Sequence, residues 1–466
     1  MRRLVLAALL LPVAAACEQS YRVYTEHPRL WLNARRLRLI QRERERDSVR
    51  WQQFLTVSKS REVLPEEPLV RALEYRVWRS EGPGKQAVAW ALQRSRVAGS
   101  PDAAELRLLA VVFDWCYPLL AETERAQIAG RMARGVSALG SQTAWPAFAA
   151  RVLAAVALAD DWPGSEQALT EAFEQRWAQD LLPALKRGRG MERPADQVAL
   201  LEVCHAVRDN LHLDLWAQAP VFFRQFPSYL LLGYYPAPIQ VAGQPFRQPA
   251  ARMKVRLDPA RDGELARRAD LLIAAYDTNS NEVLFLQGWL THDLYRLRSV
   301  TGAVYEYLWM NPYQPGLSYY SAPLFLQDEL AGNLVARSSW DDDAAWLGYL
   351  DGELQLWADG QRSLVGTTPP DNPIVFPALA VARVTGDADL QVRVPEGTDV
   401  FLVGLEAGKT YWLKTGEAKA LPRVAEVGGI LAVKVDPGEE ASLALRTTDP
   451  NPPPPTLEPK PKKKRR

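Results

Sequence analysis

Histidine and cysteine are scarce in this chain of 466 residues, which contains four His and three Cys. No Cys or His set has the spacing of a zinc site, and no G-x-S-x-G sequence is present. No Gly-rich phosphate loop follows an expected strand. These absences argue against zinc-dependent, serine-hydrolase and nucleotide-dependent chemistry.

The chain also lacks an excess of charge of either sign, since it contains 56 Lys and Arg and 55 Asp and Glu. A nucleic-acid-binding protein normally has a strongly basic face, so the composition argues against that class. The one basic concentration is local, in KPKKKRR at residues 460–466. We expect residues 449–466 to form a Pro-rich basic tail with too little apolar content to fold. This tail either contacts anionic envelope polymers or stays solvated.

The apolar run at residues 4–11 is too short to anchor the chain across a bilayer. Two arginines precede it and three alanines follow it, which predicts an export signal over residues 1–16. Small residues directly before Cys17 resemble a lipoprotein box, although Ala14 stands where Leu is usual and plain cleavage after Ala16 also fits. We expect a lipid on Cys17 and a protein exported to the periplasm, the outer membrane or the cell surface.

The other two cysteines, Cys116 and Cys204, lie in apolar helical patterns. A free Cys in such a pattern is usually a small core residue. A disulfide between them stays open at this point, because pairing cannot be deduced from sequence.

Two kinds of periodicity divide the rest of the chain. Over residues 21–315 apolar residues recur at helical spacing with no strand between the helices, which indicates helices packed on helices. Over residues 316–448 the period is two, which is typical of an antiparallel sandwich. Pro312, Pro315 and Gly316 end the last helix. The sequence predicts helices over 33–54, 101–115, 121–132, 147–159, 166–182, 195–208, 214–223 and 264–276.

Several phrases carry a resemblance to a known family. In order they are HPRLWL, VVFDWCYPLLAETERAQI, ALADDWP, APVFFRQFPSYLLLGYYP, NPYQPGLSYY, ARSSWDDDAAWLGYLDG and VFLVGLEAGKTYWL, spread from His27 to about Val435. Together they resemble the heparinase II/III-like group of polysaccharide lyases. The resemblance implies an N-terminal incomplete (α/α) toroid followed by a C-terminal antiparallel β-sandwich. It also implies a polysaccharide partner, and cleavage of uronic-acid polymers by β-elimination.

That reaction needs a group to neutralise the substrate carboxylate, a base to remove the adjacent proton and an acid for the leaving oxygen. The heparinase II/III-like lyases usually present Asn and His before an Ala-rich helix, a Tyr on a following helix and a His in the first hairpin of the sandwich. Here residues 141–145 contain neither His nor Asn, residues 190–207 contain no Tyr, and residues 346–360 contain no His.

The remaining candidates are Tyr320 as base or acid, with Gln142 and Arg337 holding the carboxylate. His205 is the imidazole nearest the expected position, and Asp209 lies four residues later on the same helical face. Each has a structural alternative: Tyr320 packs between domains, Gln142 is a solvated loop amide, and His205 and Asp209 form a surface pair.

Three adjacent carboxylates, Asp341, Asp342 and Asp343, are the one candidate for a hard cation such as Ca²⁺. Consecutive strand residues point to opposite faces, so a turn is the favoured interpretation and no cofactor is expected. We therefore expect an exported envelope protein that acts on or binds polysaccharide. The alternative is a non-catalytic glycan-binding or scaffold protein that kept the fold and lost the catalytic residues.

Overall fold

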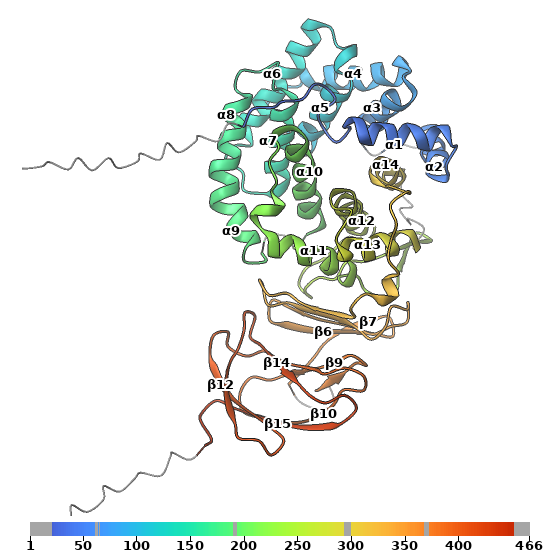
Figure 1. Ribbon diagram of the computed structural model, residues 1–466. Helices are drawn as coiled ribbons and strands as arrows, with labels where there is room; N and C mark the ends of the chain where they lie inside the picture. Colours follow the sequence, from blue (N-terminus) through green and yellow to red (C-terminus); the bar gives the residue numbers. More distant parts are fainter. Residues whose placement is uncertain are drawn as a thin grey trace, which may run out of the picture.

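The computed structural model describes residues 21–60, 64, 66–189, 193–292, 300–367 and 372–451. The expected signal segment, Cys17 and nearly all of the expected tail lie outside the described residues. A helical domain comes first and a stack of sheets follows (Figure 1), which confirms the expected fold class. Within the described ranges, no helix is both long enough and apolar enough to cross a membrane.

The helical domain extends to Trp309. Its α-helices are α1 (Ala34–Glu45), α2 (Val49–Ser58), α3 (Glu67–Trp78), α4 (Glu81–Ser95), α5 (Ala103–Trp115), α6 (Glu122–Ala138), α7 (Trp145–Ala157), α8 (Ser165–Thr170), α9 (Leu182–Leu185), α10 (Pro194–Leu211), α11 (Pro220–Leu232), α12 (Pro259–Tyr276), α13 (Asn281–His292) and α14 (Val300–Trp309). A π-helix, Glu171–Leu181, joins α8 to α9. A short hairpin, β1 (Ile239–Val241) and β2 (Gln244–Phe246), follows α11 and was not expected.

Side-chain caps explain the starts of α1, α2, α5 and α12. The predicted cap Asn33 accepts a hydrogen bond from the backbone N–H of Arg36. The predicted helix 33–54 is nevertheless two helices, because Asp47 takes a positive φ of 51° and Ser48 caps α2 anew. The predicted helix 214–223 is also wrong, since α11 begins only at Pro220.

Alternate helices form the inner wall of a ring. Helices α3, α5, α7, α10, α12 and α14 each contact the next in that order, and α1 and α2 lie between α14 and α3 (Figure 1). Helix α7 is buried along almost its whole length, as its Ala-rich sequence predicts. This arrangement places the N-terminal ends of α5, α7, α10 and α12 together at one end of the ring.

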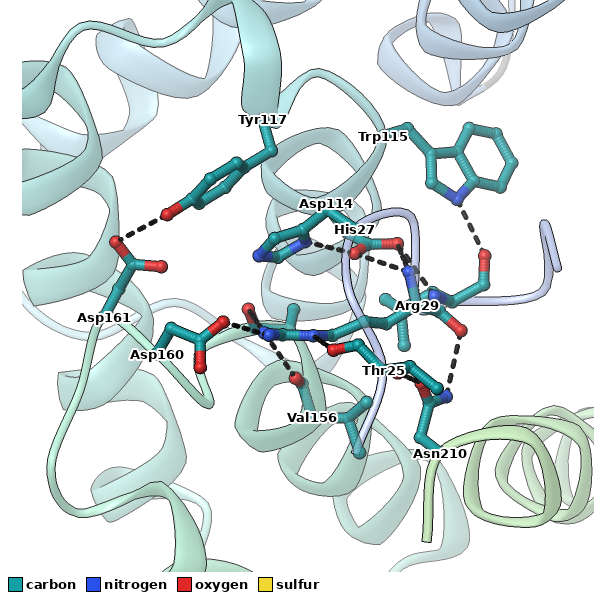
Figure 2. Close-up of polar contacts among 12 residues, drawn as sticks. Thr25, His27, Arg29, Asp114, Trp115, Tyr117, Val156, Asp160, Asp161 and Asn210 are labelled. Atoms are coloured by element: carbon teal, nitrogen blue, oxygen red, sulfur yellow. Dashed lines mark hydrogen bonds and ion pairs between the residues drawn. The ribbon is translucent and has the colours of Figure 1, made fainter. Parts of the chain in front are cut away.

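The segment before α1 is tied into this ring by one buried carboxylate (Figure 2). Asp114 on α5 accepts hydrogen bonds from the backbone N–H groups of Arg29, at 2.8 and 2.9 Å, and of Leu30, at 2.7 Å. The same carboxylate lies 2.6 Å from Nδ1 of His27. The next residue, Trp31, is thereby held inside the ring, edge-on to Trp115 at 6.3 Å.

The C-terminal part consists of short strands. They are β3 (Phe325–Gln327), β4 (Leu334–Arg337), β5 (Trp346–Leu350), β6 (Glu353–Ala358), β7 (Gln361–Leu364), β8 (Ile374–Val375), β9 (Leu379–Arg383), β10 (Ala388–Arg393), β11 (Asp399–Val403), β12 (Thr410–Thr415), β13 (Leu421–Val424), β14 (Ile430–Lys434) and β15 (Glu440–Arg446). They form three sheets with the orders β3-β4-β5-β6-β7, β14-β11-β9-β8 and β10-β15-β12-β13. All pairings are antiparallel except that of β9 with β11, which is parallel.

These sheets are stacked in three layers, whereas a sandwich has two. Because successive strand residues point to opposite faces, Val335 packs into the helical core while Leu334 packs against the second sheet. In that second sheet Phe401 faces the first sheet and Leu402 faces the third. The first sheet is therefore buried on both faces, and it joins the ring to the outer sheets.

Asp114→Asn replaces one of the acceptor oxygens with an N–H₂ group that faces backbone donors. We expect the free energy of unfolding to fall by about 3 kcal/mol, because a buried charged acceptor with several partners is lost. Asp160→Asn is the matched control, since this partner of Arg29 is 69% exposed and its loss costs below about 1 kcal/mol. Urea unfolding measures the free energy of unfolding of both variants. Equal losses for Asp114→Asn and Asp160→Asn would contradict the role of Asp114.

Candidate functional site

A cavity of about 570 Å³ lies at the end of the ring where the inner helices begin. We call it the funnel. First-turn residues of four helices line it, namely Ala103, Pro146, Ala195 and Ala260. Phe246 of β2 lines it from the hairpin side. The N-terminal end of a helix carries a partial positive charge. Asp102 and Asp258 cap α5 and α12, so the ends of α7 and α10 are the ones that favour a negatively charged ligand.

The inner wall of the funnel holds a cluster of charged groups centred on Arg107. Its Nε donates to Glu202 at 2.7 Å, and its Nη1 donates to Glu66 at 3.1 Å. The hydroxyl of Tyr305 donates to Glu66 at 3.0 Å. Arg268 lies 3.6 Å from Glu66 and stacks over the ring of Tyr305 at 4.0 Å. Two cations and two carboxylates thus neutralise one another.

This mutual pairing removes the cluster from proton transfer. Burial alone would raise the pKa of Glu66, but Arg107 and Arg268 bring that pKa below its ordinary value. Burial alone would lower the pKa of Arg107, but Glu202, Tyr305 and Glu66 raise it well above the ordinary value. Burial also raises the pKa of Tyr305 well above that of a free phenol. Near neutral pH Glu66 and Arg107 therefore stay charged, and Tyr305 stays neutral.

Arg261 differs from these groups, because it is exposed at the funnel and forms no ion pair with any residue that the structure describes. Helices α7 and α10 also begin without a side-chain cap, at Ala144 and Arg193. Pro146 and Pro194 have no N–H, and the N–H groups of Ala147 and Asp196 already donate to Ala144 and Arg193, so each helix start has few N–H groups left for solvent or a ligand. The funnel consequently offers one free guanidinium and uncapped helix ends to an anion.

A second cluster lies at the junction of the helical domain and the first sheet. The ring of His292, the last residue of α13, is 5.2 Å from Tyr319 and 6.2 Å from Tyr320. Tyr319 is edge-on to Trp340 at 5.7 Å, and Arg337 lies over Trp340 at 4.9 Å. We call these five residues the junction cluster. It brings together two predicted residues, Tyr320 and Arg337.

The groups of the junction cluster differ in exposure and charge. Tyr320 is 55% exposed, whereas Tyr319 is buried. Burial and the neighbouring Tyr320 raise the pKa of Tyr319 well above its usual value, so its phenol stays neutral. Burial and the charge of Arg247 lower the pKa of Arg337 to about 10, so it stays cationic at neutral pH. Arg247 itself donates to Asp342 at 3.0 Å.

The other predicted site residues lie elsewhere. Gln142 is exposed in the connection between α6 and α7, and no contact joins it to Tyr320 or Arg337 among the described residues. His205 is only 2% exposed, and its Nε2 lies 2.9 Å from the carbonyl oxygen of Leu272. The expectation of a surface pair between His205 and Asp209 is wrong, because the imidazole points into the ring.

Sequence reasoning missed Arg247 and His292 as neighbours of the Tyr pair. His292 was visible as one of four imidazoles, but its position near Tyr319 depends on the packing of α13 against the segment after α14. Arg247 follows a hairpin that was not expected. No pattern in the sequence connects these residues, since Arg247 lies 45 positions before His292, and His292 lies 27 positions before Tyr319.

Asp341, Asp342 and Asp343 lie in the turn between β4 and β5, where the turn interpretation places them. Asp341 accepts a hydrogen bond from Ser339, and Asp342 pairs with Arg247. The described parts of the chain contain no group of three or more His, Cys, Asp or Glu placed to hold a metal ion. Cys116 and Cys204 are buried free thiols.

The chain was compared with known proteins once this geometry was established. No family model matches it, and no curated protein matches it. A solved structure described as a glycoside hydrolase is similar over 92% of this chain and 79% of its own, with 12% identity and a TM-score of 0.31. Values this low assign neither a family nor an activity. The heparinase II/III-like resemblance stays a hypothesis, and function is argued from the residues.

The burial of His205 predicts a pH dependence of stability. Burial, with the charges of Arg208 and Arg36, lowers the pKa of His205 well below its usual value. The unfolded chain binds a proton near pH ~6.5 and the folded chain does not, so the free energy of unfolding falls below that pH. We expect a loss of up to about 1.4 kcal/mol per pH unit.

His205→Gln keeps an N–H donor for Leu272 and removes this titration. Urea unfolding between about pH 7 and pH 5 checks the effect, with a flatter dependence expected for the variant. His212→Asn is the control, because His212 is exposed and takes a positive φ that Asn tolerates. Parallel curves for the wild type and His205→Gln would contradict the assignment.

Proposed function

We propose that this protein binds an acidic polysaccharide in the funnel and holds it without cleaving it there. The observation that carries the proposal is the funnel itself, a cavity of about 570 Å³ with the uncapped ends of α7 and α10 and the exposed Arg261. Carboxylates of a uronate chain match this guanidinium and these helix ends. The resemblance to polysaccharide lyases supports the same class of ligand.

The residues at the starts of α7 and α10 favour binding over cleavage in the funnel. In the resembled group these places carry the Asn, His and Tyr of the reaction. Here the funnel is lined at these places by Pro146, Ala149, Ala195, Val198 and Ala199, none of which transfers a proton. The nearby carboxylates Glu66 and Glu202 are fixed by Arg107.

A second candidate function, β-elimination, is favoured by one observation at the junction cluster. An exposed phenol, Tyr320, lies 6.2 Å from the imidazole of His292, and the cation Arg337 belongs to the same cluster. A phenol and an imidazole can act as the acid and the base of β-elimination, while a cation binds the carboxylate. This candidate places the reaction at the junction and leaves the funnel as a binding surface.

Arg261→Gln tests the binding proposal. We expect the affinity for hexagalacturonate, measured by isothermal titration calorimetry, to fall about tenfold, because the one unpaired cation of the funnel is lost. Arg256→Gln is the matched control, since Arg256 is exposed on the same segment and does not line the funnel. Equal affinities for the wild type and both variants would refute binding at the funnel.

Tyr320→Phe tests the second candidate. If the junction cluster cleaves uronate polymers, the wild type produces the absorbance of an unsaturated product, and the variant lowers the rate by about a hundredfold or more. Tyr24→Phe controls for the loss of an exposed phenol, because Tyr24 is 61% exposed. Absence of product from a broad panel of uronate polymers, with binding retained, would eliminate cleavage and leave the binding proposal.

A further inference from the structure

A groove of about 870 Å³ lies at the end of the ring opposite the funnel. The funnel is lined by the first turns of the inner helices, whereas this groove is lined by Tyr276, the last residue of α12, and by Asn311, just after α14. Helix α1 forms one wall. Five arginines and two acidic residues line the groove: Arg35, Arg36, Arg38, Arg42, Arg208, Glu45 and Asp209. We call it the arginine groove.

Two of these arginines have structural partners. Nη1 of Arg36 donates to the carbonyl oxygens of Leu308, at 3.2 Å, and Trp309, at 2.7 Å. Nη1 of Arg208 donates to the carbonyl oxygen of Tyr276 at 2.9 Å. Both guanidinium groups thus neutralise the negative C-terminal ends of helices.

The other three arginines form a stripe along the exposed face of α1. Arg35, Arg38 and Arg42 follow helical spacing, and at 1.5 Å per residue the stripe is about 10 Å long. Arg42 lies over the ring of Tyr313 at 4.7 Å. Arg35 and Arg38 are exposed, and neither forms an ion pair within the described residues. This length suits a linear ligand with more than one negative group.

A buried amide in the same groove points independently to a ligand. Gln314 lines the groove and is only 9% exposed, yet neither its Oε1 nor its Nε2 has a hydrogen-bond partner among the described residues. An unsatisfied buried amide costs about 1 to 3 kcal/mol. The amide has both a donor and an acceptor, as a sugar hydroxyl has.

The groove is separated from the funnel by aromatic side chains. Trp31 is tilted against Trp309 at 5.9 Å, and the ring of His205 lies 4.5 Å from Trp309. On the funnel side Arg107 lies over Trp31 at 5.1 Å, and on the groove side Arg36 lies over Trp309 at 4.8 Å. Ligands at the two ends of the ring therefore occupy different sites.

We propose that the arginine groove is a second glycan-binding site, which takes an acidic saccharide chain with its charges on Arg35 and Arg38 and a hydroxyl on Gln314. The proposal rests on the proposed function only for the class of ligand. A flat lipid surface does not reach an amide that is nine-tenths buried. The near-neutral composition argues against a nucleic acid.

Calorimetry with hexagalacturonate tests the site on the full chain. The wild type should show two binding events, and Arg35→Gln/Arg38→Gln should weaken one of them about tenfold. Gln314→Met should weaken the same event about threefold while leaving the free energy of unfolding unchanged or higher, because an unpaired buried amide is removed. Loss of stability in Gln314→Met with normal binding would assign the amide a structural role and overturn the proposal.

Controls separate the groove from general electrostatics and from the funnel. Arg393→Gln/Arg423→Gln removes two exposed arginines from the sheets, and an equal loss of affinity there would overturn the proposal. Phosphatidylglycerol vesicles test a lipid source of the anion, and loss of vesicle binding alone in the Arg35/Arg38 variant would also overturn it. If Arg261→Gln changes neither event while Arg35→Gln/Arg38→Gln removes one, the groove stands and the funnel proposal fails.

Discussion

The ring depends on the hydrogen bonds that the buried carboxylate of Asp114 accepts from the chain before α1. These bonds hold the backbone of Arg29 and Leu30 against Asp114 on α5 (Figure 2). The next residue, Trp31, is thereby fixed inside the ring, where it packs against Trp115. The indole N–H of Trp31 in turn donates to the carbonyl oxygen of Glu202 at 3.2 Å. The side chain thus closes the centre of the ring, and the two ends become separate sites.

Arginine has a different role at each end of the ring. At the funnel, Arg107 forms ion pairs with Glu66 and Glu202 in a partly buried wall. At the opposite end, Arg36 binds the carbonyl groups that α14 leaves unpaired. In both places the paired arginines stabilise the wall, and the unpaired ones remain available to a ligand. This division explains how a chain with a formal net charge of +1 presents local positive surfaces.

The separation of proton-transfer groups from the funnel has a physical basis. The funnel wall contains apolar first-turn residues, the paired charges around Arg107 and the unpaired Arg261, which can hold a ligand but are not arranged to exchange a proton with it. His205 is the imidazole nearest in sequence to the position where the lyases carry a catalytic residue. It packs on Trp309 inside the ring, where burial keeps it neutral. At the junction cluster, away from the funnel, the exposed phenol of Tyr320 lies near the imidazole of His292.

The sequence by itself determined the order of a helical domain and a β part, the cap at Asn33, the buried Ala-rich helix α7 and the turn at Asp341, because periodicity and capping are local. It did not determine that the sheets stack in three layers. That stacking requires the strands of the first and second sheets to be apolar on both faces. Only the tertiary structure placed Gln314 and Arg35 in one groove, and His292 beside Tyr320. Such contacts join residues far apart in the chain, so they follow from how the ring closes and from no spacing that the sequence displays.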